Sequence, residues 1–355
     1  MTTLSRIGGG IDQVPGAVAW YVADLAEFRG RQELFTRQSP QRLKALRESA
    51  IIESAIASNR IEGVNIAQDR VRPVLVAAAA LRDRDEEEVR GYRDALRLIH
   101  DQHAELPMND ETILRLHKLC RGDIWDAGQY KDKDVDIIER YADGTSRVRF
   151  RSVPAAETPA SMAALCATWQ EVTRQPGPRL LVALAAFNLD FLCIHPFRDG
   201  NGRVSRLLLL LGLYHLGFEV GRYISLERLV EENKERYYET LQLASQKWHE
   251  GEEDPWTYVA YLLSTLKLAY RQFEQRLEMM AEPRGAKTTA VEEFIGKQTS
   301  EFTIADIEHT CPGVSRDMIR VVLQQLRKDG VVECLSRGGA GAPWRRIGAR
   351  GGATR

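Results

Sequence analysis

The residues best suited to chemistry lie in one short segment, His195-Pro-Phe-Arg-Asp-Gly-Asn-Gly-Arg203, with Arg206 one turn further on. Its Gly-Asn-Gly sequence enters an apolar stretch, where free backbone N–H groups and a helix N-terminus together bind an anion. Arg203 and Arg206 stand three residues apart, so their guanidinium groups would hold further phosphate oxygens from neighbouring positions on one helix. This arrangement predicts a site for a polyphosphate.

Two other side chains of the segment add reactive groups to this anion site. Asp199 offers a hard oxygen ligand of the kind that holds Mg²⁺ together with substrate phosphates. His195 is able to accept a proton from an attacking hydroxyl near neutral pH. Each residue alone is more often structural, but a base, a metal ligand and an anion site on one loop predict nucleotidyl or phosphoryl transfer.

Two apolar stretches flank this loop and would hold it in place. Leu180 to Ile194 and Val204 to Gly217 are apolar at nearly every position, which predicts two buried helices. Gly217 is suited to end the second helix in the left-handed conformation. Each stretch is shorter than the roughly 20 residues that cross a bilayer, so no membrane role is expected. Apolar residues at three- and four-residue spacing elsewhere predict a mainly α fold.

A β-hairpin is the exception to this helical pattern. β-type residues stand at positions 135–138 and 148–150, on either side of the turn signal Tyr141-Ala-Asp-Gly144. A helix is predicted to follow from Ser161, after the break at Pro159, because a serine hydroxyl caps helix N-termini well.

The composition changes again through a linker, Met279 to Gly285. Three short helical patterns follow, at Ala290 to Lys297, Ile304 to His309 and Ser315 to Asp329. The β-type run Val331 to Leu335 and a Gly-rich turn complete an order that resembles a winged helix-turn-helix domain. Its wing would be Gly338 to Ala342.

This C-terminal segment is locally basic, although the chain as a whole is not. Such domains bind either DNA or proteins, so DNA contact, packing within the chain and target recruitment all stay open. The basic residues concerned are Arg316, Arg320, Arg327, Lys328, Arg337, Arg345 and Arg346.

The reactive segment resembles the signature of the Fic family, H-P-F-x-[D/E]-G-N-G-R-x-x-R, and matches it at every specified position from His195 to Arg206. The resemblance extends over roughly Ile51 to Leu277. It implies a Fic-type helical bundle with a β-hairpin flap that aligns the target's backbone by strand pairing. Ile137 and Ile138 of the flap would then help to cover the nucleotide.

The resemblance also implies a role for each signature residue. His195 would be the general base, Asp199 would bind Mg²⁺, and Arg203 with Arg206 would hold the β- and γ-phosphates of ATP. Gly200, Asn201 and Gly202 would contact the α- and β-phosphates. Tyr238 belongs to a Tyr-Tyr segment that borders the adenine pocket, and Ser245 stands where some relatives carry a nucleotide-contacting Asn.

Position 202 separates two activities within the family. Relatives that phosphorylate their targets usually carry Lys at this position, whereas this chain has Gly202. The sequence therefore favours transfer of AMP from ATP.

A second motif, Ser58-Asn-Arg-Ile-Glu62-Gly63, ends a predicted helix over about residues 43–63 and resembles the family's inhibitory helix. The resemblance implies that Glu62 pairs with Arg206 and takes the place of the ATP γ-phosphate. A bidentate Arg-carboxylate pair that is shielded from water competes well for these donors. In some relatives the same Glu supports removal of AMP, and the sequence leaves this second activity open.

Composition sets the remaining expectations. Lys and Arg total 49 against 50 Asp and Glu, so no overall charge favours nucleic acid or an anionic membrane. Five cysteines without a C-x-x-C pair argue against a disulfide framework, and the first residues lack a secretory signal. A cytoplasmic protein is expected.

Together these features predict a chain of three parts and a disordered tail. Residues 1–105 would form an N-terminal helical region, 106–278 the catalytic core with a flap at about 134–151, 286–347 the winged helix-turn-helix domain, and 348–355 the tail.

The predicted activity is a protein adenylyltransferase that modifies a Ser, Thr or Tyr hydroxyl of an unknown target or of itself. Little activity is expected at rest, and relatives suggest a homodimer. Two alternatives stay open. One is an ATP-sensing DNA-binding regulator, and the other is a transferase that uses UTP, GTP or a phosphocholine carrier, because a phosphate cradle says little about the base.

Overall fold

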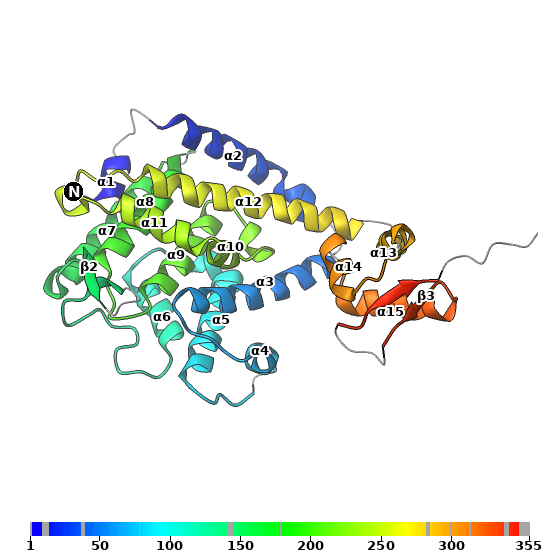
Figure 1. Ribbon diagram of the computed structural model, residues 1–355. Coiled ribbons are helices and arrows are strands. Elements are labelled where there is room, and N and C mark those ends of the chain that lie inside the picture. Colours follow the sequence, from blue (N-terminus) through cyan, green and yellow to red (C-terminus); the bar gives the residue numbers. More distant parts are fainter. Residues whose placement is uncertain are drawn as a thin grey trace, which may run out of the picture. The chain divides into compact units, whose positions relative to one another are not determined.

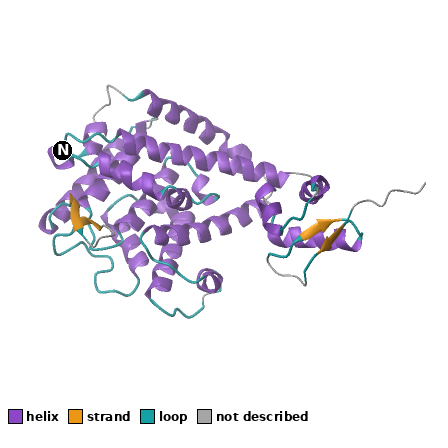
Figure 2. Cartoon of the chain, in the orientation of Figure 1, coloured by secondary structure: helices purple, strands orange, loops and turns teal. Residues whose placement is uncertain are grey.

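The structure, a computed structural model, describes residues 2–8, 14–36, 40–77, 79–140, 145–175, 177, 179–281, 285–298, 300–311, 314–336 and 341–347. The chain forms two compact units, Met1–Phe273 and Glu274–Arg355. The first unit is almost entirely helical with one β-hairpin, and the second combines short helices with a small sheet (Figures 1 and 2). The predicted mainly α fold is confirmed.

The helices of the first unit begin with α1 (Thr3–Gly8), α2 (Gly16–Thr36), α3 (Pro40–Ile61), α4 (Gln68–Leu75), α5 (Arg84–Gln102) and α6 (Asp110–Arg121). After the hairpin come α7 (Thr158–Thr173), α8 (Arg179–Ile194), α9 (Asn201–His215), α10 (Leu226–Glu232) and α11 (Lys234–Ala244). The long α12 (Trp256–Ala281) runs beyond the boundary between the units. Short 3-10 turns lie at His103–Glu105, Ala155–Glu157, Val220–Arg222 and Trp248–Glu250.

Helices α8 and α9 form the centre of the first unit, as the two apolar stretches predict. Nearly every residue of α8 is buried, since other helices surround it. Gly212 of α9 leaves room for the side chain of Leu184 on α8, so the two helices approach closely. Gly217 follows α9 with a φ of +79°, in the left-handed conformation expected of it.

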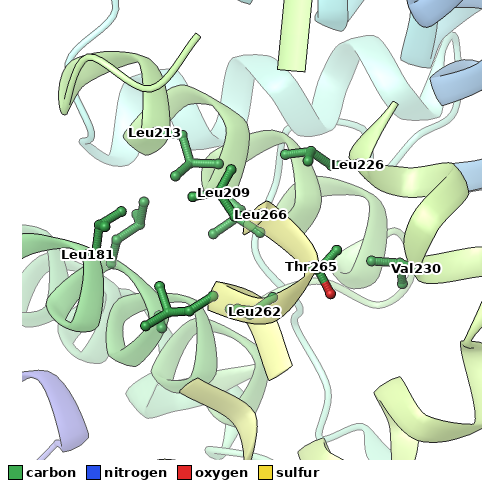
Figure 3. A pocket seen from close by; sticks show the side chains of 11 residues that line it. Leu181, Leu209, Leu213, Leu226, Val230, Leu262, Thr265 and Leu266 are labelled. Carbon is green, nitrogen blue, oxygen red and sulfur yellow. The ribbon is translucent and has the colours of Figure 1, made fainter. Parts of the chain in front are cut away.

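Between α8, α9, α10 and α12 lies a small pocket with apolar walls. Figure 3 shows Leu181, Leu213 and Leu262 around it, with the hydroxyl of Thr265 as a lone polar group among the labelled side chains. A space lined in this way offers a ligand almost no hydrogen bonds. It is a packing feature of the core, and the chemistry lies elsewhere.

Helix α5 packs against both α3 and α6, and all three helices contact α9. Their side chains reach the first turns of α9 or the loop between α8 and α9. The contact between α5 and α6 is tight. A Cβ atom on Gly91 of α5 would overlap the backbone carbonyl oxygen of Leu119 on α6. Only glycine allows the two backbones this approach.

The hairpin consists of β1 (Asp136–Arg140) and β2 (Ser146–Arg151), paired antiparallel. Ile138 lies opposite Val148 and Ile137 opposite Phe150, with a bulge between the two isoleucines. The predicted turn at 141–144 lies outside the described residues. The helix predicted from Ser161 begins earlier, at Thr158, because a proline is tolerated in the first helical turn, where its missing N–H is not needed.

The second unit contains α13 (Ala286–Lys297), α14 (Ile304–Thr310) and α15 (Arg316–Lys328), followed by β3 (Val332–Cys334) and β4 (Trp344–Arg346). Phe302 forms a bridge to Trp344, next to the β3–β4 pair. The elements follow the predicted order, with Ser315 as the N-cap of α15. The name winged helix-turn-helix stays a prediction, and most of its wing and the tail lie outside the described residues.

Among the residues that the structure describes, no helix combines the length and the apolar character that a membrane span needs.

The close approach of α5 and α6 predicts that Gly91→Ala lowers the free energy of unfolding by about 1–3 kcal/mol, because the new methyl group forces the helices apart. Gly30→Ala on α2 is the matched control, since nothing lies within 4 Å of the added Cβ. This control is expected to leave stability unchanged or raise it by up to about 1 kcal/mol. Urea unfolding measures both, and equal effects of the two changes would contradict the tight contact.

Candidate active site

Hydrogen bonds within the loop between α8 and α9 hold its conformation. The side-chain oxygen of Asn201 accepts a hydrogen bond from the Phe197 backbone N–H at 2.9 Å, and its amide nitrogen donates to the Phe197 carbonyl at 2.8 Å. Gly200 caps α9 with a φ of +84°, and His195 has a φ of +51°. A positive φ is uncommon for a residue with a Cβ, so the loop holds His195 in a strained conformation.

His195 presents a basic nitrogen to the cleft beside this loop. Its Nδ1 lies 3.3 Å from the Leu192 carbonyl oxygen, which only accepts, so Nδ1 carries the proton. The Nε2 atom then has a free lone pair and no hydrogen-bond partner among the described residues. Burial, reinforced by the positive charge of Lys131, lowers the pKa of His195 to about 4. The imidazole is therefore neutral at pH 7 and able to take up a proton.

Asp199 points a carboxylate toward solvent at the other end of the loop. Its side chain is 56% exposed and pairs with Arg121 at 2.5 Å and with Arg203 at 3.4 Å. Burial opposes the charge, but the two guanidinium groups lower the pKa of Asp199 below its usual value. The carboxylate is thus ionised near neutral pH.

His117 on α6 holds the backbone at Asp199. Its Nδ1 accepts from the Gly128 N–H at 3.0 Å, so its Nε2 carries the proton and donates to the Asp199 carbonyl at 3.1 Å. The imidazole also stacks on Phe197, with 3.7 Å between the ring centres. Burial lowers the pKa of His117 to about 4, which keeps it neutral. This contact fixes the loop from the side of α6.

Glu88 on α5 is the buried centre of a charge network beneath the loop. Its carboxylate accepts hydrogen bonds from Arg203, from Arg121 at 2.8 Å and from Arg84 at 2.8 Å. Arg203 is only 1% exposed and also lies 3.3 Å from the Asn59 side-chain oxygen. Glu88 thus holds the two arginines that hold Asp199.

Arg206 connects α9 to the end of α3. Its Nε donates to the Ser58 hydroxyl at 2.8 Å, and its Nη2 donates to the Ser58 carbonyl at 2.9 Å and to Glu62 at 2.8 Å. Ser58 lies in the last turn of α3 and Glu62 directly follows that helix, and both side chains meet Arg206. Although burial opposes its charge, Glu62 raises the pKa of Arg206. Gly63, with a φ of +86°, turns the chain away directly afterwards.

Glu62 and Gly202 lie so close that a Cβ on Gly202 would overlap the Glu62 Oε1 atom and stand 3.2 Å from Arg206 Nη1. Arg206 Nη1 is buried and has no hydrogen-bond partner among the described residues. A buried guanidinium nitrogen without an acceptor, next to a glycine at a helix N-terminus, is suited to an anion.

These residues open into a cleft of about 480 Å³, which is within the usual range for small-molecule sites. Its charged end contains His195, Gly202, Arg206 and Glu62. Its other end is mostly apolar and aromatic, with walls formed by Ile137, Ile138, Phe150, Tyr238, Leu241 and Ser245. One end is suited to phosphates and the other to a planar base.

The cleft brings together most, but not all, of the residues that the sequence singles out. Ile137, Ile138, Tyr238 and Ser245 line it, as do His195, Gly202, Arg206 and Glu62. Asp199, Gly200, Asn201, Arg203, Ser58 and Gly63 do not. The side chain of Asn201 is used within the loop, and a phosphate contact from Arg203 stays a prediction that requires its pair with Glu88 to open.

Lys131 ties the flap to the loop, and no sequence pattern singles it out. Its backbone N–H donates to the Pro196 carbonyl at 2.9 Å, and its ammonium group donates to the Ile194 carbonyl at 3.1 Å and to Ser152 at 2.7 Å. Ser152 in turn donates to the Val135 carbonyl at 2.5 Å, next to β1. Sequence reasoning also misses Glu88, His117 and Arg121, since isolated charged residues on helices usually indicate solvated faces.

Comparison with known proteins identifies the class of this site. Residues 107–213 match the Fic/DOC family, and these residues include the hairpin, α8, the loop and most of α9. This part of the chain is therefore similar to the Fic/DOC family. The reactive loop lies within the matched residues.

Particular relatives share the wider fold. A Fic family protein from Desulfovibrio desulfuricans G20 is 25% identical, with a TM-score of 0.61 over 95% of this chain and 97% of that one. Fic-1 from C. elegans is 19% identical, with a TM-score of 0.59 over 74% of each chain, which shows the fold alone. A Fido domain-containing protein of Dictyostelium discoideum is 33% identical over 98 residues, and these cover 27% of this chain and 64% of that protein.

The basic residues of the second unit are partly neutralised by acidic neighbours. Arg316 pairs with Glu308 at 2.9 Å, Arg320 with Asp317 at 2.9 Å and Arg345 with Glu333 at 2.7 Å. Each of these pairs reduces the local positive charge that would attract DNA phosphates. DNA contact through this unit stays a prediction.

The network around Glu88 predicts that Glu88→Gln lowers the free energy of unfolding by about 3–5 kcal/mol, because it leaves the buried Arg203 without a full counter-charge. Urea unfolding is the measurement. Glu105→Gln, at an exposed position, is the control and is expected to change stability by at most about 0.5 kcal/mol. A loss below about 1 kcal/mol for Glu88→Gln would show that the network does not depend on this charge.

The environment of His195 predicts that its imidazole in the free chain titrates near pH 4 instead of near the ordinary value of about 6.5. Because the folded-state pKa is lowered, the neutral, proton-accepting form is present throughout the range from about pH 5 upward. NMR titration of labelled histidine ring carbons measures this, and His195→Ala identifies the signal. A midpoint at 6 or above would contradict the predicted environment.

Proposed function

We infer that the chain is a Fic-type transferase, and we propose that it transfers AMP from ATP to a Ser, Thr or Tyr hydroxyl of a target protein or of the chain itself. One observation carries the proposal. A neutral His195 with a free Nε2 lines the same cleft as an anion site formed by Gly202 and Arg206. A proton acceptor beside a polyphosphate site is what an attacking hydroxyl requires.

The two ends of the cleft suggest how ATP would bind. The triphosphate is expected at the N-terminus of α9, where the Arg206 Nη1 atom lacks a partner among the described residues. The base is expected between Ile138 of the flap and Tyr238 of α11. Arg149 supports this end, since it donates to the Tyr238 carbonyl at 2.8 Å and joins the flap to α11.

In the proposed reaction, the oxygen of the target hydroxyl forms a bond to the α-phosphorus of ATP. The bond from that phosphorus to the bridging oxygen of pyrophosphate breaks, and pyrophosphate leaves with the electron pair. His195 Nε2 takes the proton of the hydroxyl. The chain therefore contributes positioning and proton transfer, and its arginine neutralises charge on the leaving group.

Asp199 is the residue suited to hold Mg²⁺ at this site, because its ionised carboxylate is largely exposed. Among the described residues, no cluster of three His, Cys, Asp or Glu side chains is arranged around a common metal position. Mg²⁺ is commonly held by one or two carboxylates and substrate phosphates, so a single carboxylate at the end of the cradle fits. Bound there, Mg²⁺ would neutralise charge on the phosphates.

We also propose that Glu62 keeps the chain inactive at rest. Its carboxylate occupies Arg206 and borders Gly202, where the terminal phosphates of ATP would lie. Two anions cannot share these donors, so ATP binds either without its full contacts or after Glu62 has left. Ser58 supports the same arrangement, because it accepts two further hydrogen bonds from Arg206.

A label-transfer experiment tests activity and inhibition together. Glu62→Gly is expected to raise AMP transfer at least about tenfold, because it frees the arginine for ATP, and a charge-assisted hydrogen bond is worth about 1.5–3 kcal/mol. The measurement is label on protein after incubation with ATP labelled at the α- or the γ-phosphate. Label from the α position alone, lost again in Glu62→Gly/His195→Ala, is the expected result.

Other outcomes separate the alternatives. Label from the γ-phosphate would indicate phosphorylation, and no label from any donor would favour a nucleotide sensor. Parallel incubations with UTP, GTP and a phosphocholine carrier test the donor. Equal or lower transfer by Glu62→Gly than by the unaltered chain would reject inhibition by Glu62.

A further inference from the structure

The first helix of the chain docks on the helix that ends at His195. Helix α1 packs against α8 and α7, and in Figure 1 it lies beside α8 at one end of α12. Leu4 is completely buried and Ile7 nearly so. We call residues 3–8, the whole of α1, the docked segment.

A buried carboxylate on α8 forms hydrogen bonds with this segment. Asp190, with no exposed surface, accepts hydrogen bonds from the backbone N–H groups of Thr3 at 3.0 Å and Leu4 at 2.7 Å. Its third donor is the indole N–H of Trp248, at 2.7 Å. Two of the three donors that satisfy this carboxylate therefore come from the docked segment. A buried ionised group that loses such donors is strongly destabilised.

The docked segment also fixes the loop that follows Trp248. The Thr3 hydroxyl donates to the buried Glu253 carboxylate at 2.6 Å, and Arg6 forms an ion pair with the same group. Arg6 further donates to the Glu253 carbonyl at 3.1 Å. Asp190 thus holds the first residue of the Trp248–Glu250 turn, and the contacts with Glu253 hold the chain just after the turn.

This turn carries the side chains that support the flap. Trp248 contacts the ring of Phe150 edge-on, with 6.4 Å between the ring centres, and His249 stacks on Phe150 at 5.3 Å. The His249 ring donates from Nε2 to the Arg151 carbonyl of β2 at 2.7 Å. Phe150 is itself a wall of the nucleotide cleft. A continuous set of contacts therefore joins the docked segment to the cleft.

We propose that Thr3, Asp190 and Trp248 are positioning residues for the nucleotide cleft, and that the docked segment holds Phe150 and strand β2 in place through them. The proposal rests on the proposed function only in taking ATP as the ligand of the cleft. None of the three residues lines the cleft, so their effect passes through Phe150.

The ionisation of Asp190 agrees with this arrangement. Burial raises its pKa to about 6, and the hydrogen bonds from Leu4, Trp248 and Thr3 act in the opposite direction. Near neutral pH these donors favour the charged form of the carboxylate. Undocking of the segment would remove two of them and loosen the remaining contact with Trp248.

The test measures ATP affinity in the Glu62→Gly/His195→Ala background, which leaves Arg206 free for ATP and does not turn it over. Trp248→Phe removes the indole N–H that binds Asp190, and Trp169→Phe on α7 is the matched control. Thr3→Val removes the hydroxyl that binds Glu253, and Thr3→Ser retains it. Isothermal titration with ATP and Mg²⁺ gives the dissociation constant, and urea unfolding shows that each variant is folded.

The proposal expects Trp248→Phe and Thr3→Val to weaken ATP binding about five- to tenfold, while Trp169→Phe and Thr3→Ser stay within about twofold of the background. Unchanged ATP affinity in Trp248→Phe and Thr3→Val would overturn it, as would an equal loss in the controls. Failure of the AMP-transfer assay would reject the proposed function and leave this measurement valid. Absence of ATP binding by the background chain would reject both.

Discussion

The pairing of Arg206 with the end of α3 is the interaction on which the arrangement of the site depends. Arg206 lies on α9 one turn after Gly202. Ser58 and Glu62 together accept three of its hydrogen bonds. A buried guanidinium group needs acceptors, so removing α3 would leave an unsatisfied charge in the core. The end of α3 and the residue that follows it therefore stabilise Arg206, which lines the cleft.

The charged residues of the site differ in burial, and this difference distinguishes those that hold the structure from those available to a ligand. Glu88 and Arg203 are both buried and paired, whereas Asp199 and Glu62 are 56% and 27% exposed. Exposed groups exchange partners at low cost, because water compensates for the lost contact. Asp199, which would bind Mg²⁺, and Glu62, which would leave Arg206, are therefore the carboxylates that exchange partners at low cost. Glu88 stays paired and keeps the loop in place.

The sequence predicts the parts of this molecule that depend on local pattern. The apolar stretches of α8 and α9, the hairpin and Gly217 follow from periodicity, β-type residues and the freedom of glycine. Glu88, Arg121, His117 and Lys131 do not, because each acts through a contact with residues more than 30 positions away. In the sequence, a single Glu on a charged helix looks the same as a surface residue. Only the folded structure shows that Glu88 is buried and holds Arg203 and Arg121.

The geometry at Gly202 links the identity of this residue to the pairing of Glu62 with Arg206. The position has no side chain, and the Glu62 carboxylate occupies the space that a Cβ would fill. A larger residue would push Glu62 off Arg206, so the pair requires glycine there. Because Glu62 directly follows α3 and directly precedes Gly63 in its left-handed conformation, a small movement of this helix end would release it. If Glu62 inhibits the chain as proposed, a partner that moves the end of α3 would raise activity without touching the loop between α8 and α9.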